Sequence, residues 1–283
     1  MWFDTLIDKG LIPNNALRFF VRKGLNRYTN RINKLSLPEL KNIRKEFIDK
    51  LLEYPITINT LDANEQHYEV PPLFFETILS NHMKYSGSIW DSDHDDLESS
   101  DESTLEIYCA RANIKDGDRI LELGSGWGSL SLYLAIKFPN CEITTVTNSQ
   151  SQHDWIKNKT ARLNVNNIDV IKSDIAIFET TKKYNRILSI EMFEHLRNPK
   201  LLLDKIENWL TDNGLLFIQV FSHNNFPQFF DNTNKSWMSR YFFTGGMMPY
   251  LGLYHDVKPN MTLKSQWEVS GINYSNTLEA WLN

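Results

Sequence analysis

Cysteine is scarce in this 283-residue chain, which contains only Cys109 and Cys141. Their spacing fits neither a zinc site nor a redox motif, and two cysteines do not make the disulfide framework of a secreted protein. We therefore expect a cytoplasmic protein without a metal site. No apolar run approaches the ~20 residues of a membrane span, and the N-terminus lacks the basic and apolar segments of a signal peptide.

An excess of positive charge is also missing. The chain has 30 Lys and Arg against 35 Asp and Glu, a net charge of −5, which argues against a general nucleic-acid partner. Repeats and low-complexity tracts are absent. With 41% hydrophobic and 23% charged residues, the composition is that of a folded globular protein, which excludes a disordered or collagen-like chain.

The chain divides into three zones, and the first, residues 1–90, is predicted to be a helical cap. Residues 36–39 form a capping box that begins one helix. The preceding segment, 17–34, carries six basic and no acidic side chains: Arg18, Arg22, Lys23, Arg27, Arg31 and Lys34. They are interleaved with apolar residues, so the segment is either the solvated face of a helix or a helix that contacts lipid headgroups.

The second zone, 91–222, begins with seven acidic side chains in 91–102. Some match the ligand spacing of a calcium loop, but Asp96 replaces the glycine that such a loop needs. We therefore expect a solvated acidic loop that leads into a helix.

The rest of this zone alternates strands and helices. The expected strands are 119–123, 141–147, 168–172, 184–190 and 215–221, and the last helix, 199–210, is expected to end at Asn213-Gly214. Five strands with four helical crossovers predict a doubly wound, mainly parallel α/β sheet of the Rossmann-like kind. The third zone, 223–283, is rich in aromatic residues and turns, and we interpret it as a substrate lid.

A glycine-rich turn after the first strand is the strongest local signal. Gly124, Gly126 and Gly128 follow a G-x-G-x-G pattern, whereas a dinucleotide site has G-x-G-x-x-G and binds a pyrophosphate. Glu122, two residues before the turn, would repel a pyrophosphate. The pattern favours a ligand with a cationic part, such as S-adenosyl-L-methionine (SAM).

The ends of the next two strands extend this interpretation. Asn148 and Gln152 offer uncharged groups to a ribose where a dinucleotide site expects a carboxylate. Asp174 is suited to accept the adenine amino proton and Ile175 to cover the ring; the alternative for Asp174 is a turn cap.

The whole chain resembles the coclaurine N-methyltransferases, a branch of the cyclopropane-fatty-acid-synthase-type SAM-dependent methyltransferases. The segments that carry the resemblance are co-linear: 63–71, 84–86, 121–129, 148–152, 189–195, 240–243 and 267–282. The resemblance implies a class I methyltransferase fold and SAM as the cofactor. Family members continue for several tens of residues beyond position 283. Residues 266–269 are expected to begin a sixth strand, and the last strand of the fold is expected to be missing.

The resemblance also assigns roles to individual residues. Tyr85 and Ser86 would contact the carboxylate end of SAM, Gly124 and Gly126 the methionine part, Asn148 and Gln152 the ribose, Asp174 and Ile175 the adenine. Ile190 would belong to the same cofactor site. Glu191, Glu194 and His195 would face the methyl acceptor.

A nitrogen nucleophile must lose its proton before it can accept a methyl group. The imidazole of His195 is suited to take that proton, since an unperturbed imidazole has a pKa near ~6.5. Glu191 or Glu194 would orient the imidazole or attract the amine cation. Phe193, Trp237 and Tyr241 would wall the site and bind the cation face-on. The alternative role of His195 is that of a structural histidine, and the aromatic residues could instead belong to the core. A metal site formed by Glu191, Glu194 and His195 is not expected, because the sequence shows no second His or Cys to complete it.

Three functions are compatible with the sequence. The first is a SAM-dependent N-methyltransferase that acts on a small-molecule amine, which the segment Leu196-Arg197-Asn198 favours by its resemblance to that branch. The second is a cyclopropane-fatty-acyl-phospholipid synthase-like enzyme that acts on lipid acyl chains. The basic N-terminal segment is compatible with this function, because it could contact lipid headgroups peripherally. The third is a non-catalytic SAM-binding protein. The sequence indicates neither the acceptor nor the oligomeric state.

Overall fold

The protein was analysed as a computed structural model that describes residues 6–7, 9–58, 70–91, 96–231, 237–257 and 260–283. The chain divides into two compact units, Met1–Phe47 and Ile48–Asn283, so the boundary falls inside helix α3 (Leu37–Leu52). The division into 1–90, 91–222 and 223–283 remains a sequence prediction.

The first unit contains helix α2 (Asn14–Ile32) and the start of α3. The predicted capping box is confirmed. The Ser36 N–H donates to Glu39 Oε2 at 2.7 Å, and the Glu39 N–H donates to Ser36 Oγ at 3.4 Å. These reciprocal bonds satisfy backbone donors that the first turn of α3 leaves open.

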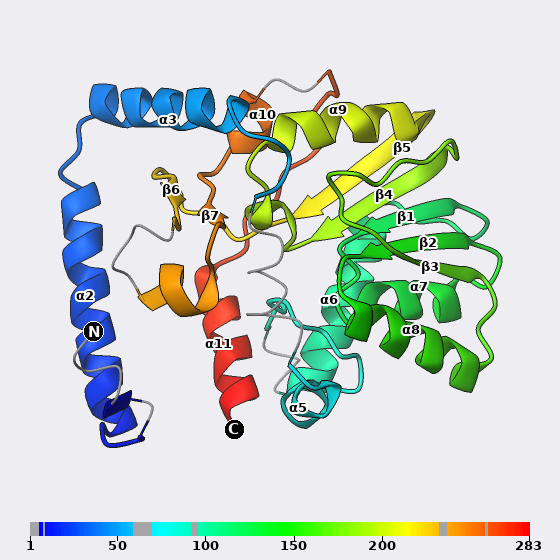
Figure 1. The fold of residues 1–283 in the computed structure, drawn as a ribbon, viewed down its shortest axis with the longest axis horizontal. Coiled ribbons are helices and arrows are strands. Elements are labelled where there is room, and N and C mark those ends of the chain that lie inside the picture. The colour runs from blue at the N-terminus through cyan, green and yellow to red at the C-terminus, as the bar shows by residue number, and fades with distance from the viewer. Residues whose placement is uncertain (1–5, 8, 59–69, 92–95, 232–236, 258–259) are drawn as a thin grey trace. The chain divides into compact units, whose positions relative to one another are not determined.

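The second unit is built on a five-stranded parallel sheet (Figure 1). Its strands are β1 (Arg119–Leu123), β2 (Glu142–Thr147), β3 (Ile168–Lys172), β4 (Tyr184–Ile190) and β5 (Leu210–Gln219). The order β3-β2-β1-β4-β5 confirms the predicted doubly wound fold. Because the winding changes direction between β1 and β4, the loops after these two strands diverge and leave room for a ligand.

The crossovers differ from the expectation in number. Helices α7 (Ser129–Lys137), α8 (Gln150–Leu163) and α9 (Pro199–Trp209) connect strands, but residues 173–183 join β3 to β4 through turns alone. The prediction of a fourth helical crossover was therefore wrong. Figure 1 shows α7 and α8 on one face of the sheet and α9 on the other.

The start of β5 and the predicted sixth strand also differ from the expectation. Strand β5 begins at Leu210, so Gly214 lies inside the strand and does not end α9. The β4–β5 pairing shifts register between Tyr184 and Arg186, and this irregularity accommodates the additional residues. Residues 266–269 form no strand, so the predicted sixth strand is absent from the described ranges.

Shorter elements complete the second unit. They are α5 (Pro72–Ile78), α6 (Leu97–Arg111), the 3-10 turn η1 (Phe193–His195), the π-type turn η2 (Met238–Phe242), α10 (Leu253–Asp256), α11 (Gly271–Leu282) and the antiparallel pair β6 (Gln228–Phe229) and β7 (Met247–Met248). Asp96 caps α6 by accepting from the Ser99 N–H at 2.7 Å, as expected for an acidic segment that leads into a helix. Residues 92–95 of the segment with calcium-loop spacing, 91–102, lie outside the described residues.

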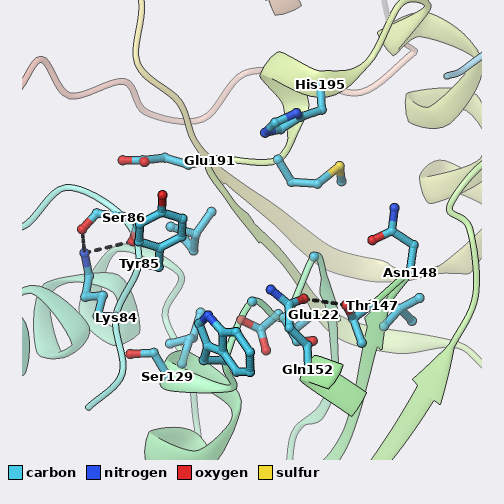
Figure 2. A pocket seen from close by; sticks show the side chains of 18 of the residues that line it. Lys84, Tyr85, Ser86, Glu122, Ser129, Thr147, Asn148, Gln152, Glu191 and His195 are labelled. Atoms are coloured by element: carbon cyan, nitrogen blue, oxygen red, sulfur yellow. Dashed lines mark hydrogen bonds between the residues drawn. The ribbon is translucent and has the colours of Figure 1, made fainter. Parts of the chain in front are cut away.

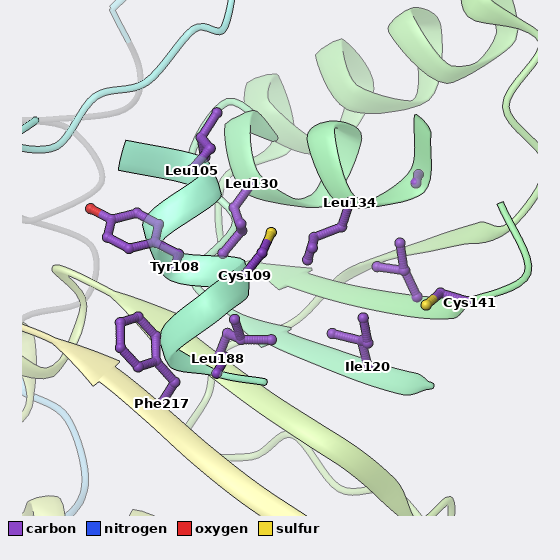
Figure 3. Close-up of a cluster of buried hydrophobic side chains, with 12 residues drawn as sticks. Leu105, Tyr108, Cys109, Ile120, Leu130, Leu134, Cys141, Leu188 and Phe217 are labelled. Carbon is purple, nitrogen blue, oxygen red and sulfur yellow. The ribbon is translucent and has the colours of Figure 1, made fainter. Parts of the chain in front are cut away.

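The main core lies between helices α6 and α7 and the sheet (Figure 3). Leu105 and Tyr108 come from α6, Leu134 from α7, and strand residues such as Ile120 close the cluster. Both free cysteines are buried in it. The core thus fixes α6 and the start of α7 against β1, which ends at the glycine turn. Within the described ranges, no helix has the length and apolar character needed to cross a membrane.

The core predicts a contrast between two positions on α7. Leu134→Ala removes a fully buried side chain and is expected to lower the free energy of unfolding by about 2–5 kcal/mol. Ile136→Ala, at an exposed position on the same helix, is expected to change it by less than about 0.5 kcal/mol. Urea unfolding followed by circular dichroism measures both, and equal losses would contradict the described packing.

Candidate functional site

The turn after β1 depends on the backbone freedom of glycine. Gly124, Gly126 and Gly128 have φ values of +83°, +50° and +81°, a region that other residues rarely adopt. A Cβ at Gly124 would lie 2.8 Å from Met192 Cγ, whereas a Cβ at Gly126 would meet nothing within 4 Å. The turn therefore packs closely on one side and borders open space on the other.

That open space is part of a cavity of about 400 Å³ at the carboxyl ends of the strands. Its walls come from the ends of β1 to β4, the segment 83–86, the segment 242–245 and helix α11. All ten residues predicted to bind the cofactor line it: Tyr85, Ser86, Glu122, Gly124, Gly126, Asn148, Gln152, Asp174, Ile175 and Ile190.

Glu122 reaches the cavity wall from β1 and is only 2% exposed. Thr145, on the neighbouring strand β2, donates its hydroxyl to Glu122 Oε2 at 3.0 Å. Burial raises the pKa of Glu122 from 4.5 to about 7, because a charged carboxylate loses most of its hydration there. A cationic group in the cavity would compensate for that loss.

Polar groups without a protein partner lie at the same wall. The Thr147 hydroxyl donates to Gln152 Oε1 at 2.7 Å, but Gln152 Nε2 is buried with no hydrogen-bond partner. Two other cavity-lining residues, Ser125 and Ser129, also have a buried Oγ without a hydrogen-bond partner. Since a buried polar group normally has a partner, these atoms fit a polar ligand such as SAM.

The part of the cavity that was predicted to hold the adenine is formed by the loop after β3. Asp174 Oδ1 accepts from the Ala176 N–H at 2.8 Å, so Asp174 is a turn cap, the alternative that the sequence left open. This bond uses one carboxylate oxygen, and Asp174 also lines the cavity beside Ile175. The capping bond fixes the carboxyl group at the wall, so the two interpretations are compatible.

Glu191 and His195 lie along one side of the cavity, across from Glu122, Ser129 and Gln152 (Figure 2). Glu191 has a left-handed φ of +49° and sits immediately after β4. Its Oε1 accepts from the Gly87 N–H at 2.9 Å and from Gln219 Nε2 at 3.1 Å, while burial raises its pKa.

His195 closes the 3-10 turn η1, with its N–H bonded to the Met192 carbonyl at 3.0 Å. Its ring meets the ring of Phe243 edge-on, with centroids 4.7 Å apart. Both residues line the cavity, so an aromatic side chain holds the imidazole at the wall.

Three of the predicted residues do not line the cavity, and the side chain of a fourth, Tyr241, lies outside the described part of the structure. Glu194, the middle residue of η1, has a fully buried side chain. Its Oε1 accepts from the Phe221 N–H at 2.8 Å, and burial raises its pKa well above the ordinary value of a glutamate. Phe193 is also buried and packs on Tyr254, with ring centroids 5.4 Å apart. In a tight 3-10 turn successive side chains diverge widely, so Phe193 and Glu194 face the interior.

The other two come from the aromatic zone. Trp237 is 47% exposed and does not line the cavity. Tyr241 lies in η2, and its side chain falls outside the described part of the structure. Aromatic residues of the C-terminal part that do line the cavity are Phe221, Phe242, Phe243, Tyr274 and Trp281.

Sequence reasoning also missed Lys84, which lines the cavity next to Tyr85 and Ser86. Its position inside the segment 84–86 was the available signal. Gly87 and Gln219 were missed as well, because their bonds to Glu191 span 104 and 28 residues. Among the described residues, no three His, Cys, Asp or Glu side chains converge as metal ligands.

Comparison with known proteins identifies the family of this chain. The model of the mycolic acid cyclopropane synthetase family matches residues 57–283. The chain belongs to this family. A relative, the (S)-coclaurine N-methyltransferase of Thalictrum flavum subsp. glaucum, is 32% identical over 98% of this chain and 77% of its own length. The cyclopropane-fatty-acyl-phospholipid synthase of Escherichia coli strain K12 is 26% identical over 77% of this chain and 55% of its own length.

A solved structure gives the same result in three dimensions. Coclaurine N-methyltransferase bound to N-methylheliamine and SAH has a TM-score of 0.94 and 31% identity, and the match covers 98% of this chain and 81% of that one. The predictions of the family, of the class I fold and of a SAM-dependent methyltransferase are thereby confirmed.

The burial of Glu122 predicts a pH effect on stability. Between pH 4.5 and about 7 the folded protein binds a proton that the unfolded chain has released, so the free energy of unfolding falls as the pH rises through this range. Glu122→Gln cannot ionise and is expected to make this decline shallower, while the raised pKa values of Glu191 and Glu194 maintain the remainder. Urea unfolding from pH 5 to 8 tests it, with Glu102→Gln at an exposed position as the control. Parallel curves for the parent protein and Glu122→Gln would contradict it.

Proposed function

We propose that this protein transfers the methyl group of SAM to an amine nitrogen of a small molecule. One observation carries the proposal: Glu191 and His195 line the same cavity as the glycine turn, on its opposite side. The coclaurine N-methyltransferase structure, which holds a methylated amine together with SAH, supports it through its similarity over almost the whole chain.

Bound SAM would supply a methyl group on a positively charged sulfur. Tyr85 and Ser86 would hold its carboxylate end, and buried Glu122 would face its ammonium group. Gln152, whose Nε2 has no protein partner, would join Asn148 at the ribose. Asp174 and Ile175 would hold the adenine. This assignment leaves the Glu191 side of the cavity to the acceptor.

The residues on that side suit an amine. Glu191, tied down by Gly87 and Gln219, would attract an ammonium ion into the cavity. His195 would take the proton that the ammonium must lose before it can act as a nucleophile. The rings of Phe221, Phe243 and Tyr274 would keep water away and present aromatic faces to the cation. Holding both reactants in one cavity would lower the barrier by roughly 7–11 kcal/mol.

A lipid acyl chain is the alternative acceptor, since a cyclopropane-fatty-acyl-phospholipid synthase is also a relative. Incubation of the purified protein with methyl-labelled SAM and separate mixtures of amines and phospholipids decides between them. Mass spectrometry should find label in amines that have gained a methyl group. Label in lipids that have gained a methylene would overturn the proposal, and so would the absence of any labelled product.

His195 gives the first mutational test. His195→Ala is expected to lower kcat by about 100-fold or more, because the proton acceptor is lost. The dissociation constant of SAM, measured by calorimetry, should change by less than about twofold. His255→Ala, which removes an exposed histidine, should change neither quantity. A His195→Ala enzyme with unchanged kcat would exclude His195 from the mechanism.

We also propose that helix α2 binds anionic membrane surfaces. It carries Arg18, Arg22, Lys23, Arg27 and Arg31 and no acidic residue. Its side chains Phe19, Phe20, Val21 and Leu25 are 58–65% exposed, although they are apolar. Basic charge combined with exposed apolar side chains suits the interface of an anionic bilayer.

Vesicle sedimentation tests this contact. Binding is expected to vesicles that contain phosphatidylglycerol, and it should weaken as salt is added. The double substitution Arg22→Glu and Lys23→Glu should weaken binding by at least about tenfold, given roughly 1 kcal/mol for each basic residue. Lys157→Glu with Lys182→Glu makes the same change in net charge at exposed positions elsewhere and should have a smaller effect. Equal binding to purely zwitterionic vesicles would contradict the proposal.

A further inference from the structure

Lys84 is a buried ammonium group at the cavity wall. The residue is 2% exposed, and its Nζ donates to the Ser86 carbonyl at 3.0 Å, to Ser86 Oγ at 2.9 Å and to the Gly87 carbonyl at 2.7 Å. These three bonds use all three protons of the ammonium group. Figure 2 shows the side chain beneath the Tyr85–Ser86 segment.

The segment that Lys84 binds is also bonded to two carboxylates. The Gly87 N–H donates to Glu191 Oε1 at 2.9 Å, and the Ser88 hydroxyl bonds to Asp101 Oδ1. Asp101 comes from α6 and also accepts from the Ser80 hydroxyl at 2.6 Å. Residues 86–88 are therefore held by one buried cation and two acidic groups.

There is little room for this segment to move. A Cβ at Gly87 would lie 2.5 Å from the ring of Tyr274 on α11, and the Ser88 N–H donates to Thr277 Oγ1 at 3.0 Å. Lys84 binds the carbonyl of Gly87 in this confined segment, and the N–H of the same residue holds the Glu191 carboxylate.

We infer that Lys84 is a positioning residue that fixes, through Gly87, both the segment that holds the methyl donor and the carboxylate that receives the amine. The inference rests on the proposed function for the roles of Glu191 and Ser86. The donor end and the acceptor end of the cavity are then set by one ammonium group, whose three protons all bond protein oxygens.

The charge of Lys84 also acts on Glu191 directly. Burial raises the pKa of Glu191, and the positive charge of Lys84 opposes this rise. The other titratable groups around Glu191 are Asp101 behind Lys84, Glu194 and His195 in the following turn, and the phenols Tyr85 and Tyr108. Lys84 is the one lysine in this set, and burial lowers its pKa to about 8, so it places a positive charge near Glu191 below that pH.

The test uses Lys84→Met, with Lys182→Met at an exposed position as the matched control. Lys84→Met is expected to weaken binding of SAH about tenfold or more in calorimetry and to lower kcat by a similar factor, because hydrogen bonds from a charged group are lost. The acidic limb of the kcat/KM pH profile should move to higher pH, since Glu191 loses a nearby positive charge. A folded Lys84→Met enzyme with unchanged SAH affinity and an unchanged acidic limb would overturn the inference.

Lys84→Arg covers the case in which Lys84→Met does not fold. Arginine keeps the charge but cannot place its donors on the same three oxygens. We expect weaker SAH binding with an acidic limb close to that of the parent enzyme, and parent-like SAH affinity and kcat would overturn the inference. The binding measurement separates this inference from the proposed function, because it requires no amine acceptor. Glu191→Gln with full activity would instead reject the proposed role of Glu191.

Discussion

The loops that follow β1 and β4 pass each other at Gly124 and Met192, and the site is arranged around this contact. The two strands are neighbours at the point where the winding of the sheet reverses, so beyond the contact their loops separate. A side chain at position 124 would meet Met192, which is why glycine is required there. On one side of the contact lies the glycine turn with Glu122, and on the other lies Glu191.

Acidic groups dominate the buried charge around the cavity. Glu122 and Glu191 line it and Glu194 lies behind it, and burial raises the pKa of all three. A buried carboxyl group without a cation tends to stay protonated, and a cation beside it restores the charged form. SAM and an ammonium acceptor both bring positive charge, so each would supply what one end of the cavity lacks. Lys84 is already engaged with backbone carbonyls and does not satisfy this demand alone.

Most of the predicted residues that line the cavity are those whose positions follow directly from a parallel sheet. Glu122, Asn148, Asp174 and Ile190 stand at or just beyond successive strand ends, and such ends meet at one edge of the sheet. Predictions that depend on the direction of a side chain within a turn were weaker. Phe193 and Glu194 lie between two cavity residues in the chain, yet the 3-10 turn directs both inward. Contacts such as Gly87 with Glu191 join distant segments, and no local pattern encodes them.

On the proposed function, the choice of acceptor lies in the walls of the cavity and not in Glu191 and His195. Removing a proton from an ammonium and completing a methylene bridge on a double bond both need a proton acceptor, so the two residues would suit either reaction. The wall beside them is aromatic: Phe243 meets His195 edge-on, and Phe221 lies between Phe243 and Tyr274. Aromatic faces bind an alkyl chain through apolar contact, and they attract a cation in addition. This additional attraction supports the proposal of an amine acceptor.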